Sequence, residues 1–65
     1  MTQDELIWRA PCVNHPELSV TVSRTAVGTY CMMFRDDDAR AIIETRIFNY
    51  RDSAESCAHR LMTQP

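Results

Sequence analysis

The sequence has little glycine, no lysine and an odd number of cysteines. Its single glycine, Gly28, leaves no glycine-rich loop of the kind that cradles a phosphate group. Three cysteines behind an acidic rather than basic amino end do not suit a secreted disulfide scaffold. No apolar run approaches the roughly 20 residues that a membrane span needs. We therefore expect a soluble cytoplasmic protein with reduced thiols.

The length of 65 residues predicts one small domain, residues 1–65, with little room for an enclosed active site. The net charge is −2, and all seven basic residues are arginines. The total charge therefore predicts no long-range attraction to nucleic acid or to an anionic membrane. The planar arginine fork instead favours paired contacts with carboxylates.

The clearest local pattern is helical and lies near the carboxyl end, at residues 52–62. Apolar side chains recur there with the spacing of one helical face: Ala54, Cys57, Ala58, Leu61 and Met62. Asp52 is expected to cap the first turn, and Glu55 is expected to complete a capping box. A helix this short is marginal alone, so its apolar face should pack on a sheet formed earlier in the chain.

Two stretches before this helix have strand patterns. Residues 18–26 alternate between apolar and mostly hydroxyl side chains, which predicts a strand with one wet face. Gly28 follows, and its freedom at positive φ favours a hairpin turn. Residues 29–35 carry apolar groups on both faces, which predicts a strand that is central or covered on both sides.

Residues 40–50 fit either a helix or a third strand with Ala41, Ile43 and Ile47 pointing inward. We favour the strand because β-branched and aromatic residues dominate the second half of this stretch. Residues 2–10 fit a short helix or a buried strand, and the Thr2 to Glu5 capping-box spacing favours one or two helical turns. The predicted fold class is α+β, a three-stranded antiparallel sheet with a C-terminal amphipathic helix on one face and an optional short N-terminal helix.

Four residues form a tempting zinc constellation: Cys12, His15, Cys57 and His59. Residues two apart on a helix point about 200° apart, so Cys57 and His59 cannot easily reach one ion. Cys57 is better explained as a small core residue. The same residues supply no convincing cysteine nucleophile with its base, so we expect no metal, no cofactor and no enzymatic activity.

A run of three aspartates, Asp36, Asp37 and Asp38, forms either a solvated turn or an acidic tip that docks on a basic partner surface. In the docking interpretation, nearby arginines would pair with carboxylates of the partner, and an aromatic side chain would be the anchor. The arginines are Arg35, Arg40 and Arg46, and the candidate anchors are Trp8 and Tyr30.

The expected order of elements resembles that of double-stranded RNA-binding domains, which are also about this long. Such domains place lysines at the start of the last helix, where this chain has Asp52, Ser53 and Glu55. Direct nucleic-acid binding is therefore the alternative, and it would need a basic face made by Arg24, Arg46 and Arg51.

The sequence thus predicts a small non-catalytic module that binds a larger protein or a protein–nucleic acid complex, as an inhibitor or adaptor. In its length and its mixture of arginines and acidic residues, the chain is similar to phage-encoded anti-CRISPR and anti-restriction proteins. No membrane partner is expected, and a second copy of the chain is a further candidate partner. A small zinc-stabilised domain is the remaining alternative.

Overall fold

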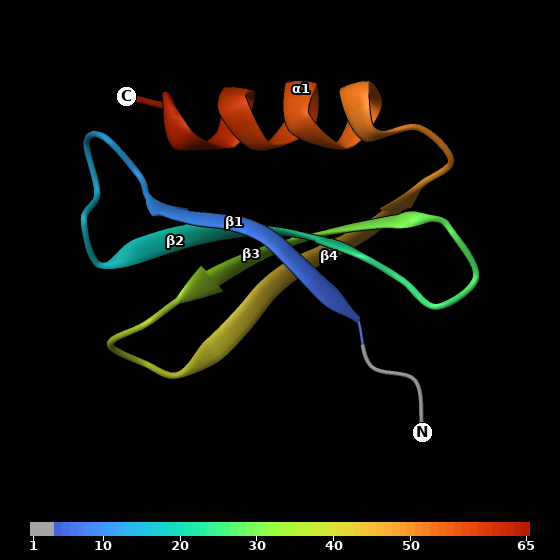
Figure 1. Cartoon of the computed structure of the whole chain (residues 1–65). Helices are drawn as coiled ribbons and strands as arrows, with labels where there is room; N and C mark the ends of the chain where they lie inside the picture. The colour runs from blue at the N-terminus through green and yellow to red at the C-terminus, as the bar shows by residue number, and fades with distance from the viewer. Residues whose placement is uncertain (1–3) are drawn as a thin grey trace.

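The computed structural model describes residues 4–65, which form a four-stranded antiparallel sheet with one helix across one face (Figure 1). The elements in chain order are β1 (Glu5–Pro11), β2 (Leu18–Arg24), β3 (Tyr30–Asp36), β4 (Ala41–Phe48) and α1 (Arg51–Met62). Each strand pairs with its neighbour in the sequence, so the sheet is a meander. The α+β class, the antiparallel sheet and the C-terminal helix are confirmed, but the sheet has four strands rather than three.

The additional strand is β1, which lies where the sequence pattern favours a short helix. Trp8 and Ala10 of β1 lie directly opposite Val22 and Val20 of β2, beside the core. Pairing with a neighbouring strand therefore overrides the local capping signal, as tertiary contacts commonly do for short segments. Thr2, one half of the capping-box spacing, lies outside the described residues.

The strand preference for residues 40–50 is confirmed by β4, but the predicted inward face is wrong. Ile43 and Ile47 are 53% and 59% exposed, and Ala41 is exposed as well. Two of the β4 positions on the helix side are charged: Glu44 lies opposite Phe34, and Arg46 lies opposite Met32. These charges remain accessible to water because α1 packs mainly on β2 and β3.

The core lies between α1 and the two central strands. It is formed by Val20, Val22, Met32 and Phe34 of the sheet, with Cys12, Ala54 and Ala58. Ala54 and Ala58 are fully buried, one helical turn apart, and their small side chains let α1 approach the sheet closely. The predicted apolar face of this helix is therefore confirmed.

The start of α1 differs from the predicted capping box. Tyr50 is the N-cap residue, and no side chain there bonds to the first turn. Glu55 instead accepts a hydrogen bond of 2.6 Å from Nε of Arg51. That bond lowers the pKa of Glu55 below its ordinary value, since it favours the charged carboxylate.

Both inner turns follow from local chemistry. Gly28 has φ of 87° in the β2–β3 turn, as its place in the sequence predicts. The β3–β4 turn has no glycine, and Arg40 takes the left-handed conformation with φ of 53°. Asp36 stabilises this turn, because its Oδ1 accepts hydrogen bonds of 3.1 Å from the N–H groups of Asp38 and Ala39.

Candidate functional site: the open face of the sheet

The sheet face turned away from α1, here called the open face, carries no described helix or strand (Figure 1). Residues directly opposite each other in antiparallel strands point to the same side. The pairing register therefore places three rows of side chains across the open face. The rows are Leu6, Ser23, Cys31 and Ile47; Arg9, Thr21, Met33 and Thr45; and Pro11, Ser19, Arg35 and Ile42.

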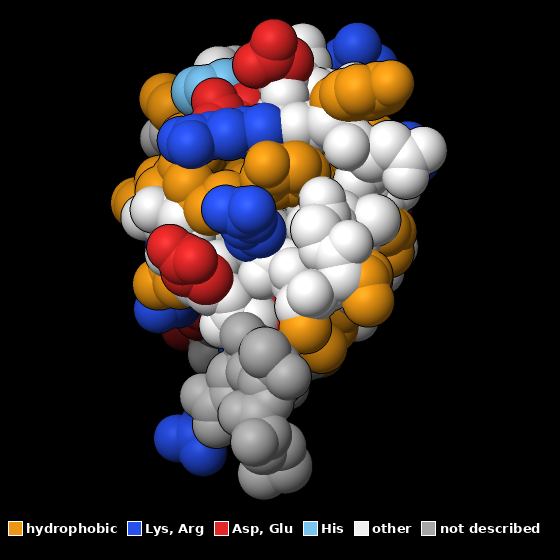
Figure 2. Space-filling model, turned by 45° about the vertical axis from the view of Figure 1, so that its right-hand side comes forward, with side chains coloured by type: hydrophobic (Ala, Val, Ile, Leu, Met, Phe, Trp, Pro, Cys, Tyr) orange, Lys and Arg blue, Asp and Glu red, His pale blue; other side chains and the backbone are white. Residues whose placement is uncertain are grey.

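Large apolar side chains are exposed at both margins of the open face. Leu6 of β1 is 60% exposed, and Ile42 and Ile47 of β4 are 56% and 59% exposed. Ile43, at the irregularity in the β3–β4 register, adds a fourth such side chain. Hydrophobic side chains also reach the surface in separate patches between charged groups in the view of Figure 2. Exposed apolar groups gathered on one side of a small protein are typical of an interaction surface.

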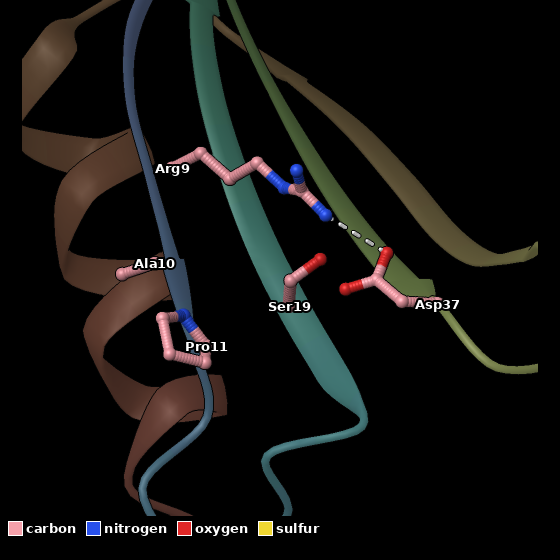
Figure 3. Close-up of a pocket in the computed structure, with 5 residues that line it drawn as sticks. All are labelled: Arg9, Ala10, Pro11, Ser19 and Asp37. Carbon is pink, nitrogen blue, oxygen red and sulfur yellow. Dashed lines mark ion pairs between the residues drawn. The ribbon is translucent and has the colours of Figure 1, made fainter.

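A small open pocket of about 210 Å³ lies at one end of this face (Figure 3). It is lined by Arg9, Ala10, Pro11, Ser19 and Asp37. Nη2 of Arg9 lies 3.0 Å from Oδ1 of Asp37, so an ion pair spans β1 and the residue that follows β3. The N–H group of Asp37 also donates to the carbonyl of Glu17 at 2.9 Å, which holds this residue beside the start of β2.

Ser19 lies beneath the ion pair and is only 2% exposed. Its hydroxyl points towards the space between Arg9 and Asp37 in Figure 3. Within the described residues, neither the Ser19 hydroxyl nor the buried Nε of Arg35 has a hydrogen-bond partner. Arg9 and Ser19 were not predicted as site residues, because the alternation of β2 marks Ser19 as facing outward but does not reveal what covers it.

The three aspartates of the predicted acidic tip have different environments in the structure. Asp36 is used inside the turn and Asp37 pairs with Arg9, as described above. Asp38 is exposed at the tip of the turn. The run therefore combines a turn residue, an ion-pair residue and one exposed carboxylate.

The three predicted arginines do not form one cluster. Arg35 lies on the open face opposite Ser19 and Ile42, whereas Arg40 is exposed in the turn. Arg46 lies on the helix side of β4, where its Nε donates to the carboxylate of Glu44. Only Arg35 of the three therefore belongs to the open face.

The two candidate aromatic anchors, Trp8 and Tyr30, are on the helix side and pack against the core. The Trp8 ring lies 5.7 Å from that of His59, with an angle of 32° between the ring planes. Both aromatic side chains are partly buried rather than fully exposed. Their packing gives each a structural role in this chain.

The two histidines of the possible zinc site, His15 and His59, have different contacts in the structure. His15 contacts the carbonyl of Pro65 and the Glu17 carboxylate, and His59 contacts Trp8. No group of three or more metal-ligating side chains occurs in the part of the chain that the structure describes. Burial, followed by the nearby charge of Glu17, raises the pKa of the Cys12 thiol.

Cys31, on the open face, has a raised pKa as well, because burial and the charge of Asp4 both disfavour the thiolate. These protonated thiols are weaker nucleophiles than thiolates. Among residues 4–65, no helix is both long and apolar enough to cross a membrane.

Comparison of the chain with protein-family models, with curated proteins and with solved structures finds no match.

Proposed function

We propose that this chain is a small non-catalytic protein-binding module whose contact surface is the open face of the sheet. The observation that carries the proposal is the exposure of Leu6, Ile42 and Ile47 on one face that no described element covers. Burying such side chains against a partner removes apolar area from water, which is the main favourable term in protein association.

One end of the open face, here called the polar end, carries Arg9, Ser19, Arg35 and Asp37. These side chains favour specific rather than non-specific binding. The Arg9–Asp37 ion pair and the guanidinium of Arg35 offer both charge signs beside the apolar margin. A partner surface with apolar groups opposite the two margins and a charged group opposite this end would match this arrangement. Asp38, exposed at the adjacent turn, is the remaining part of the acidic tip that can contact a basic group of the partner.

Such a module would act as an inhibitor or an adaptor of a larger protein machine, in the manner of phage-encoded anti-CRISPR and anti-restriction proteins. A chain of this size can cover part of a partner's surface by binding alone, without catalysing a reaction. Its raised thiol pKa values and the packing of His59 on Trp8 favour a binding role over a catalytic one.

The test is an affinity pull-down with tagged protein, with and without nuclease, in which the wild type is compared with a Leu6→Thr/Ile47→Thr variant. We expect the wild type to retain one protein in stoichiometric amount, with and without nuclease, and we expect the variant not to retain it. Threonine keeps the β propensity of these positions while removing most of their apolar area.

Val27→Thr is the matched control, since Val27 is exposed in the β2–β3 turn and lies outside the three rows. It should retain the same partner. Retention that disappears with nuclease would replace the proposal by nucleic-acid binding. Equal retention by wild type and face variant would show that the partner does not use the open face.

A further inference from the structure

β4 is an edge strand whose outer side has no paired strand among the described residues. It pairs with β3 on one side, and six of its eight residues are exposed. The other edge, β1, ends in Pro11, which has no N–H group to donate, and each edge strand has one register irregularity, between Leu6 and Trp8 in β1 and at Ile43 in β4. Residues 43–48 of β4 contain neither proline nor glycine, so β4 is the edge better suited to pair with another strand.

We propose that two copies of this chain pair antiparallel through β4, about a two-fold axis that passes through Thr45. This register places Glu44 of each copy opposite Arg46 of the other. Ile43 of each copy then lies opposite Ile47 of the other, and the two Thr45 residues face each other. Opposite charges and paired β-branched side chains are both favourable directly across an antiparallel pair.

The charges select this register over its neighbours. Moving the axis to Glu44 would place two glutamates opposite each other, and moving it to Arg46 would do the same with two arginines. Directly opposed like charges are destabilising. An axis between two residues would pair side chains from opposite faces, which the pleat of a sheet does not allow.

Within one chain, Arg46 already donates to Glu44, and both side chains are partly exposed. Pairing of two copies would exchange the two contacts within the chains, one in each copy, for two contacts between the chains. The axis is perpendicular to the sheet, so both helices would lie on the same side of one eight-stranded sheet. The open faces of the two copies would then form one continuous surface. The dimer proposal does not rest on the proposed function, because it needs no other protein partner.

The test is the molar mass in solution, measured by sedimentation equilibrium from micromolar to millimolar concentration. The wild type is expected to approach twice the chain mass of 7.5 kDa. Glu44→Arg alone and Arg46→Glu alone should each be monomeric, because each variant opposes like charges across the axis. An equimolar mixture of these two variants should form a heterodimer, since every opposed pair is then of opposite sign.

The combined Glu44→Arg/Arg46→Glu variant should recover the homodimer, and it guards against misfolding of either single variant. Leu6→Thr changes the open face at the far edge and should leave the dimer intact. A wild type that stays monomeric up to millimolar concentration would overturn the proposal. So would a dimer that survives in both single charge variants, because the contact would then lie elsewhere.

Discussion

Ser19 and Arg35 lie directly opposite each other on β2 and β3, and each buries a polar atom without a partner among the described residues. A buried hydroxyl or guanidinium N–H that makes no hydrogen bond loses its hydration without compensation. The Arg9–Asp37 ion pair lies over this position and contributes to the burial. The unpartnered polar atoms of Ser19 and Arg35 therefore lower the free energy of unfolding.

Replacing Ser19 by alanine should stabilise the protein. Removing the unpartnered hydroxyl relieves a desolvation cost of about 1 kcal/mol, which exceeds the small loss in β propensity. The measurement is the free energy of unfolding from urea denaturation. Ser23→Ala, on the same strand and the same face, is the control and should show no gain. A loss of stability in Ser19→Ala would mean that the hydroxyl is hydrogen-bonded in solution.

The Arg9–Asp37 ion pair should be weak and sensitive to salt. The two side chains are 55% and 33% exposed, so water screens their attraction. A double-mutant cycle with Arg9→Gln and Asp37→Asn is expected to give a coupling of about 0.2 to 1 kcal/mol. The coupling should shrink in concentrated salt. A larger coupling that salt does not change would indicate a pair shielded from solvent.

Tyr50→Asp should stabilise the start of α1. Tyr50 is 73% exposed and has the extended conformation of an N-cap residue, with φ of −126° and ψ of 140°. An aspartate there can accept a hydrogen bond from a free N–H group of the first turn, and we expect a gain of about 1 kcal/mol in unfolding free energy. Tyr50→Ala separates capping from loss of the ring. Equal stabilities of the two variants would argue against a capping effect.

Stability should decline in alkaline solution because of the buried thiols. The pKa values of Cys12 and Cys31 are raised in the folded chain, so the unfolded chain releases these protons first. The resulting stabilisation is complete below the ordinary thiol pKa of about 8.5 and is lost as the pH rises through the folded values.

Urea denaturation across a pH series checks this sign, and Cys12→Ala should flatten the alkaline decline. Thiol labelling at neutral pH should modify the partly exposed Cys57 before the two buried cysteines. Fast labelling of Cys12 in the folded protein would contradict its buried position.

The amphipathic helix and the central hairpin could be predicted because their patterns are local. The helical spacing of Ala54 and Ala58 and the alternation in β2 each identify a face without reference to the rest of the chain. Gly28 marks the β2–β3 turn because its φ of 87° lies in the region that favours a residue without a side chain. The candidate site was less predictable, because Arg9, Ser19 and Asp37 come together only through strand pairing.

The spacing of the side chains alone predicts that α1 has one apolar face, that one face of β2 carries hydroxyl side chains and that β3 is central. Strand pairing and the position of α1 account for the rest: residues 5–11 form β1, and the isoleucines of β4 lie on the open face while Glu44 and Arg46 lie on the helix side. The reason is physical. Periodicity shows which side chains share a face, but the direction in which that face points is decided by the strand register and by how far a short helix can cover the sheet.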